Sequence, residues 1–339
     1  MLNSKTVFIL GAGASSEVDF PLGSELKKII VSKLDLEADY NGNVTRGEKK
    51  IFRHLNSKYP RRINEFYAFC RQISKGIVLS DSIDDFIDDH KHDERVAICG
   101  KLAIAYSILE AENCSKLSFN SIDNSINFLF VEDTWYAKFY SLLKKNITKD
   151  NIDNIFNNVT VINFNYDRSL EHYLINAISQ NYLIEKVQAQ NIVSKLICYH
   201  PYGSIDHSVE FGSDKSLDFD NIMSNLKTYT QQVEDVEGLT KVKQAIQDSE
   251  VIIFLGMAYH KNNMDLLQCE CNITKKKIYA TRGGIEDNEL RLLKRMILNL
   301  DCSDIQDNIK YRFETSDTIS FAKECRNLFD NYRLSLLEL

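Results

Sequence analysis

Side chains that could do acid–base chemistry lie at the ends of two apolar runs. Asn163, Asn165 and Asp167 belong to the stretch VINFNYDRSLE, and His200 belongs to YHPYGSID. An asparagine amide can hold a hydroxyl or a water without adding charge, and a histidine, whose ordinary pKa is about 6.5, can accept a proton near neutral pH. Together the two residue types could position a water and take its proton. Turn asparagines and a loop histidine without any ligand are the alternative interpretation.

A glycine turn near the start of the chain could bind a phosphate. In VFILGAGASS, Gly11, Ala12 and Gly13 follow four apolar residues, and Ser15 could add a hydroxyl donor. Glycines let the backbone approach a diphosphate closely, and the next helix offers free N–H groups to it. Ser16 stands where the dehydrogenase fingerprint has its third glycine, and the chain has no Gly-Lys-Ser/Thr P-loop. A tight strand–helix connection without a ligand is the alternative interpretation.

Two further apolar runs end in candidate binding residues. The run VIIFLGMAYH carries Gly256 and His260, and the run KIYAT ends at Thr281. Because the carboxyl ends of parallel strands meet at one edge of a sheet, we expect these residues to lie near the glycine turn. With Asn163 and Asp167, they are predicted to line a nucleotide site.

Strand and helix patterns alternate in the part of the chain that carries these residues. Alternating elements require crossover connections, and continuously apolar strands are typical of a sheet buried on both faces. We therefore predict an α/β fold, a Rossmann-like parallel sheet with helices on both faces. The predicted strands cover 6–11, 159–164, 195–199, 250–256 and 277–281. The predicted helices that alternate with the later strands cover 168–179, 262–270 and 285–300.

Apolar residues recur at helical spacing throughout residues 22–157, which predicts a helical module inserted after the first strand and helix. We place the Rossmann-like nucleotide-binding domain at 1–34 and 158–339 and the helical insertion module at 35–157. The end of the chain, 320–339, predicts a helix with an apolar stripe that either folds back onto the core or docks a subunit.

The overall composition bears on partners and location. The 339 residues carry a net charge of −7, which disfavours direct binding of nucleic acid. No apolar run approaches the length of about 20 residues that spans a bilayer. The eight cysteines are scattered, mostly in apolar surroundings, with Cys269 and Cys271 as the one close pair. We therefore expect reduced thiols, no metal site, no membrane contact and a cytoplasmic protein.

Taken together, the motifs resemble the sirtuin superfamily, and in particular the bacterial sirtuin-like domains that destroy NAD during antiviral defence. The stretch GAGAS…FPLG resembles the family's phosphate loop and its proline-containing cofactor loop, which places Pro21 in that loop. FNYD resembles the Gln-Asn-x-Asp stretch, so the resemblance implies that Asn165 acts in catalysis. FLGMAYHKNNMDLL resembles the segment that holds the adenosine half of NAD, and SDSIDDFI (80–87) resembles a further motif of the defence domains.

The chain departs from sirtuins at two points. Where sirtuins carry His-Gly at the catalytic base, this chain has His-Pro-Tyr-Gly, a form also found in defence-type members. The resemblance places the base on His200, with Tyr202 as the alternative. The paired Cys-x-x-Cys zinc ribbon of sirtuin deacetylases is absent from the sequence, which favours NAD consumption without a protein substrate.

The resemblance implies an NAD hydrolase that converts NAD to ADP-ribose and nicotinamide and depletes the cell of NAD when triggered. NAD is then the substrate, and no metal takes part. Such an activity must be held off until infection, so we expect control by homo-oligomerisation or by a partner, such as a HerA-type ring ATPase or another sensor protein. Two alternatives remain: an NAD-dependent protein deacylase, and a silent module that senses NAD or ADP-ribose and gates a partner.

Overall fold

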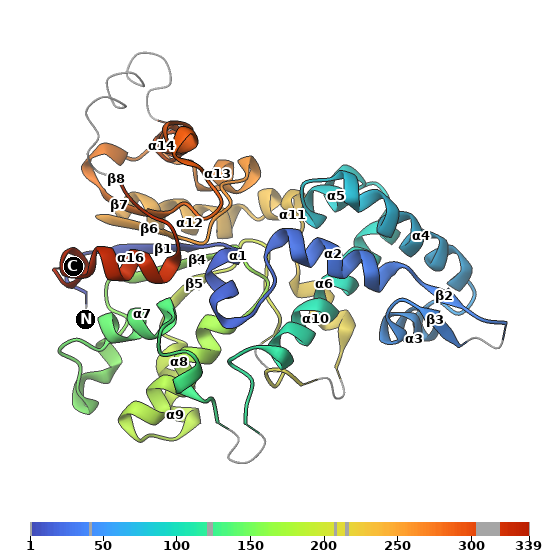
Figure 1. Ribbon diagram of the computed structural model, residues 1–339, viewed down its shortest axis with the longest axis horizontal. Coiled ribbons are helices and arrows are strands. Elements are labelled where there is room, and N and C mark those ends of the chain that lie inside the picture. Colours follow the sequence, from blue (N-terminus) through green and yellow to red (C-terminus); the bar gives the residue numbers. More distant parts are fainter. Residues whose placement is uncertain are drawn as a thin grey trace.

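A six-stranded parallel sheet forms the centre of the computed structural model, which describes residues 2–40, 43–120, 125–206, 209–213, 217–302 and 319–338. The strands lie in the order β5-β4-β1-β6-β7-β8 (Figure 1). Their bounds are β1 (Thr6–Leu10), β4 (Val159–Asn163), β5 (Ile197–Tyr199), β6 (Val251–Leu255), β7 (Lys277–Thr281) and β8 (Ile319–Ala322). The predicted α/β fold class is confirmed.

The strand order creates a switch point between β1 and β6. From β1 the chain steps outward through β4 to β5, then returns to the other side of β1 with β6 and steps outward again to β8. Doubly wound dinucleotide-binding folds have this order and bind their ligands outside the strand ends at such a point. Both strands that flank it are buried along their whole length, which explains their continuous apolar sequences.

Crossovers between parallel strands of one sheet are right-handed as a rule. Because the steps from β1 to β5 and from β6 to β8 run in opposite directions, such crossovers place their helices on opposite faces. The helices of this domain are α1 (Ala12–Ser15), α7 (Trp135–Leu143), α8 (Ser169–Tyr182), α9 (Lys186–Val193), α12 (Val236–Asp248), α13 (Lys261–Leu267), α14 (Leu290–Leu298), α16 (Cys325–Asn331) and α17 (Arg333–Leu337). Short 3₁₀ helices cover Ser16–Val18, Ile77–Leu79, Phe128–Phe130, Lys149–Asn154, Ile273–Lys275 and Asp287–Glu289.

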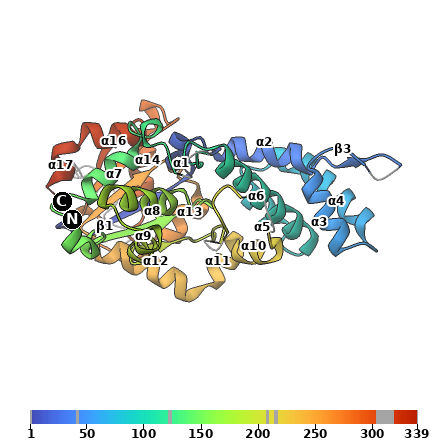
Figure 2. The ribbon, with the colours of Figure 1, turned by 90° about the horizontal axis from the view of Figure 1, so that it is seen from below.

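A helical module extends from the end of the sheet toward which the strands' carboxyl ends point (Figure 1). Figure 2 shows that it gives the molecule an elongated shape. The module consists of α2 (Gly23–Leu34), the hairpin β2 (Glu37–Ala38) and β3 (Val44–Arg46), α3 (Lys49–Lys58), α4 (Ile63–Gly76), α5 (Ile83–Asp89), α6 (Glu94–Cys114), α10 (Phe219–Asn225) and α11 (Tyr229–Glu234). A buried ion pair, Arg168 Nε to Glu112 Oε1 at 2.9 Å, joins α6 to the residue before α8.

The contacts divide the chain differently from the predicted bounds of the module, 35–157. Helix α2 lies before that range yet packs on α4 and α6, and α10 and α11 come from after β5. Conversely, α7 lies inside the range but packs on the sheet, where the rings of Phe139 and Phe8 are 4.8 Å apart. The indole Nε1 of Trp135 donates to the carbonyl oxygen of Ala14 at 2.7 Å, so α7 also supports the glycine turn.

One prediction, for the end of the chain, is wrong. Residues 320–339 were expected to form one helix, but Ile319–Ala322 form the edge strand β8, and α16 and α17 follow it. Helix α16 packs on β8, β7 and α7, so this part of the chain does fold back onto the core. Within the described residues, no helix is both long enough and apolar enough to cross a membrane.

Candidate functional site

Two glycine turns meet at the switch point between β1 and β6. The backbone N–H of Gly13 donates to the carbonyl oxygen of Gly256 at 2.9 Å. A Cβ on Gly13 would lie 2.8 Å from the Cα of Gly256, and Gly256 itself has a φ of +64°. The close approach of the two backbones therefore requires both glycines even without a ligand. For a phosphate to bind the Gly13 N–H, it would have to replace the bond to Gly256.

Asn165 joins the end of β4 to the glycine turn of β1. Its Nδ2 donates to the carbonyl oxygen of Gly11 and to Oγ of Ser15, both at 3.0 Å. Its backbone N–H donates to Oδ1 of Asn163, the last residue of β4, at 3.1 Å. Both asparagines are buried. Because Nδ2 is bound to these two acceptors, Oδ1 is the atom that the Asn165 amide can offer to a hydroxyl or a water.

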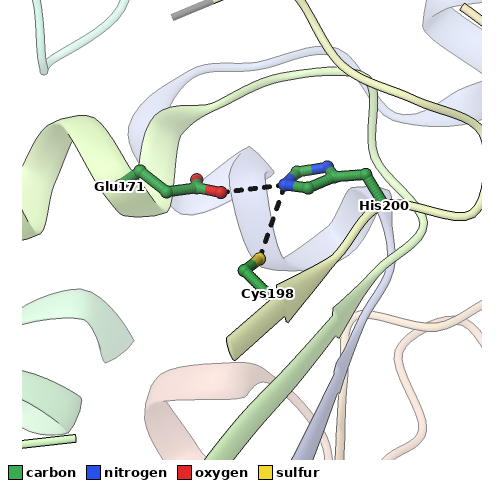
Figure 3. Close-up of side chains that lie close together, drawn as sticks. All are labelled: Glu171, Cys198 and His200. Carbon is green, nitrogen blue, oxygen red and sulfur yellow. Dashed lines mark hydrogen bonds and ion pairs between the residues drawn. The ribbon is translucent and has the colours of Figure 1, made fainter. Parts of the chain in front are cut away.

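His200 reaches the same place from the end of β5. Its Nδ1 lies 3.3 Å from the backbone carbonyl oxygen of Asn165, and its Nε2 lies 2.8 Å from Oε1 of Glu171 in the first turn of α8. Sγ of Cys198, on β5, lies 3.4 Å from the same Nε2 (Figure 3). The side chains of His200 and Glu171 are 11% and 9% exposed. The ring is thus oriented by a carboxylate on one side and faces Asn165 on the other.

Burial and charge act in opposite directions on His200. Burial lowers the pKa of the imidazole, but the Glu171 carboxylate and its hydrogen bond raise it, and the net shift is upward. Nε2–H donates to the carboxylate and Nδ1 faces the carbonyl oxygen of Asn165, so both ring nitrogens face acceptors, which favours the protonated ring. Once the ring is neutral with its remaining proton on Nε2, Nδ1 is the nitrogen that can take a proton on the side of Asn165.

Tyr202, the alternative base, is oriented away from this pair. Its hydroxyl donates to Oδ1 of Asn263, in α13, at 2.7 Å. Burial raises the pKa of the phenol well above its ordinary value, which makes it a poor proton acceptor near neutral pH. Of the two candidates, His200 is the one placed beside Asn165.

Asp167 belongs to a buried polar network below the glycine turn. Its Oδ1 accepts from the backbone N–H of Ser169 at 3.0 Å and from that residue's hydroxyl. Oγ of Ser169 lies 2.7 Å from the hydroxyl of Tyr136 and 3.4 Å from Oγ of Ser15. Burial raises the pKa of the Asp167 carboxyl, although the hydrogen bonds from Ser169 oppose the shift. These contacts indicate that Asp167 holds the start of α8 and the glycine turn in place.

Acidic side chains of α5 connect the helical module to the same edge of the sheet. The hydroxyl of Tyr166, next to Asn165, donates to Oδ1 of Asp84. Oδ1 of Asp85 accepts from Nδ2 of Asn262, in α13, at 3.0 Å. Burial raises the pKa of Asp84 to about 6, with Tyr166 opposing the shift. The stretch SDSIDDFI thus contacts the segment that follows β4 and the helix that follows β6.

The predicted site residues fall into three groups in the structure. One group surrounds Asn165. The second group consists of Gly256, in the turn after β6, and Thr281, the last residue of β7, and the N–H of Gly256 donates to Oγ1 of Thr281 at 2.7 Å. The third consists of Pro21, half-buried before α2, and His260, exposed as the N-cap residue of α13. Within the described residues, no hydrogen bond or ion pair joins either of these two to Asn165 or His200. The first group contains Gly11, Ala12, Gly13, Ser15, Asn163, Asn165, Asp167 and His200.

Sequence reasoning missed Glu171 and Cys198. Cys198 could have been found, because residues two apart on a strand face the same side, which places its thiol beside His200. Glu171 gave no such signal, because an acidic residue in the first turn of a helix is ordinary. Only the packing of α8 against β5 brings its carboxylate to the imidazole.

Comparison with known proteins identifies no family for the chain. Neither a scan against protein-family models nor a search of the curated proteins finds a match. The resemblance to sirtuin-like domains therefore rests on the motifs quoted above.

Proposed function

We propose that this protein hydrolyses NAD to ADP-ribose and nicotinamide at the switch point between β1 and β6. The observation that supports this most directly is that Asn165 and His200, from the ends of two strands, meet beside the Gly11–Gly13 turn. The fold supplies the expected position for a dinucleotide. The sirtuin-like motifs supply the substrate and the type of reaction.

The proposed reaction is a displacement at C1′ of the nicotinamide ribose. The bond from C1′ to the pyridinium nitrogen breaks, its electron pair neutralises the ring, and nicotinamide leaves. A water oxygen bonds to C1′, and the proton it loses passes to Nδ1 of His200. Oδ1 of Asn165 orients a ribose hydroxyl or the water. In the neutral ring with its proton on Nε2, Nδ1 makes no hydrogen bond to the Asn165 carbonyl oxygen 3.3 Å away, so its lone pair is available to the water.

The helical module offers a route by which a partner or a second copy could control the site. Asp84 and Asp85 bind Tyr166 and Asn262, which lie at the same edge of the sheet as Asn165. A movement of α5 would therefore shift the residue next to Asn165. This fits the expectation that homo-oligomerisation or a ring-forming ATPase partner switches the activity on.

The experiment measures nicotinamide released from NAD by the purified chain, alone and with candidate partner ATPases, together with NAD binding by calorimetry. Asn165→Ala and His200→Ala are expected to lower the rate by about 100-fold or more, the scale of one acid–base or positioning group. The exposed His92→Ala is the control and should keep the wild-type rate. Unchanged release from Asn165→Ala, or wild-type protein that neither binds nor cleaves NAD, contradicts the proposal.

A further inference from the structure

Three side chains that ligate transition metals converge beside the proposed site. Nε2 of His200, Sγ of Cys198 and a carboxylate oxygen of Glu171 all lie within 4.8 Å of one another. The side chains come from a strand, the loop after it and a neighbouring helix, and all three point to one place (Figure 3). Nothing in the proposed hydrolysis uses the thiol.

Two of the three separations between the donors are close to those around a tetrahedral zinc ion. Zinc bond lengths of about 2.0–2.3 Å place neighbouring ligand atoms about 3.3–3.6 Å apart. Nε2 lies 3.4 Å from Sγ and 2.8 Å from Oε1. Of these two distances only the second must open, by about half an ångström, which small side-chain rotations can supply. The third separation, from Sγ to a carboxylate oxygen of Glu171, is within 4.8 Å.

The donor types and their charges select a particular class of ion. Thiolate and imidazole suit zinc and similar borderline-soft cations, whereas magnesium and calcium prefer oxygen ligands throughout. A divalent ion with one thiolate, one carboxylate and one neutral imidazole has no net charge, which favours it in a buried place. Three protein ligands leave the fourth tetrahedral position for a water.

The surroundings already provide the support that a metal-bound histidine needs. Such a histidine donates its other ring N–H to a carboxylate or a backbone carbonyl. Nδ1 of His200 faces the carbonyl oxygen of Asn165 at 3.3 Å. The site is also reachable, because β5 is an edge strand of the sheet and Cys198 is only partly buried.

The geometry points to a binding site for Zn²⁺ or a similar cation at Glu171, Cys198 and His200, which switches the enzyme off. Binding releases the thiol proton of Cys198 and the Nε2 proton of the protonated His200 ring to solvent, and the metal takes the lone pair that is freed on Nε2. The neutral ring then keeps its proton on Nδ1 and has no lone pair left to accept another. The inhibitory consequence rests on the proposed function, whereas the metal site does not.

The test is a titration of the metal-free full chain with Co²⁺, followed by displacement with Zn²⁺. Wild-type protein should bind one ion with a thiolate-to-cobalt charge-transfer band and the intense visible bands of four-coordinate cobalt. Cys198→Ser should lose the charge-transfer band and at least about 100-fold in affinity, and Glu171→Gln should keep the band but bind about 10-fold or more weakly. Cys114→Ser, at an exposed cysteine, is the control and should behave as wild type.

X-ray absorption of the zinc-loaded wild type provides a measurement that needs no variant. One sulfur at about 2.3 Å with nitrogen and oxygen at about 2.0–2.2 Å is expected. Absence of binding, two or more sulfur ligands, or a charge-transfer band that persists in Cys198→Ser overturns the site. A separate assay of nicotinamide release with added Zn²⁺ tests the inhibition. Protein that binds zinc but never cleaves NAD refutes the proposed function and leaves the metal site standing.

Discussion

Gly256→Ala is expected to be among the most damaging single-methyl changes in this chain. Gly256 has a φ of +64°, and a Cβ there would lie 1.9 Å from the backbone N of Ala14 and 2.2 Å from the carbonyl carbon of Gly13. Both are backbone atoms of the opposing turn, so no side chain can move aside. The glycine turn after β1 and the glycine turn after β6 would therefore have to move apart.

The size of the effect follows from two contributions. An alanine in the left-handed region costs about 1–2 kcal/mol of folding free energy. Forcing extra volume into a packed place costs typically about 1–3 kcal/mol more. We therefore expect Gly256→Ala to lower the free energy of unfolding by about 2–5 kcal/mol, a large share of the stability of an ordinary domain.

Gly284→Ala separates the two contributions. Gly284 has a similar φ of +78°, but a Cβ there would meet no atom within 4 Å. This variant should lose only the conformational part, about 1–2 kcal/mol. Urea unfolding followed by circular dichroism measures both variants under the same conditions. Equal losses for the two variants would refute the inference that close backbone contact requires glycine at position 256.

Three further changes test other contacts. Asp84→Asn keeps an acceptor for the Tyr166 hydroxyl but removes a carboxyl whose pKa burial raises from 3.8 to about 6. Such a group contributes its full stability below pH 3.8 and loses that contribution as pH rises through about 6. In urea unfolding, the free energy of unfolding of the variant should therefore rise by up to about 3 kcal/mol relative to wild type between about pH 4 and 7.5. A difference between the two proteins that does not change with pH would count against this. Glu112→Ala leaves the Arg168 charge buried and should cost about 3–5 kcal/mol by the same assay; a loss below 1 kcal/mol would show that the pair is dispensable. Tyr202→Phe should keep the wild-type rate of nicotinamide release and lower the free energy of unfolding by about 1 kcal/mol. Abolished release would indicate that Tyr202 is the base.

The sheet could be predicted from the sequence because its central strands are buried on both faces. Their uninterrupted apolar runs leave little choice of structure, and the five predicted strands match the observed bounds within two residues at each end. Strand β8 was missed because it is a short edge strand with three half-buried residues out of four. The helical spacing of the apolar residues that follow it dominated the prediction for that region.

The site could be predicted only as far as strand ends determine it. Parallel strands bring Asn165 and His200 to one edge whatever the rest of the chain does, so their meeting follows from topology. Their other partners depend on packing between distant segments. The contact between Glu171 and His200 needs α8 to lie against β5, and the contact between Asp84 and Tyr166 needs α5 to reach the segment that follows β4. No local pattern of residues encodes either arrangement.

The bond from Trp135 to Ala14 gives the protein a natural optical probe. Trp135 is the only tryptophan of the chain, its side chain is buried, and its Nε1 donates to a carbonyl oxygen within the Gly11–Ser15 segment. Indole emission responds to the polarity and hydrogen bonding of its surroundings. The indole emission of the unlabelled chain therefore reports on the surroundings of Trp135, which include this segment, and a nucleotide that rearranges the segment can be titrated by emission.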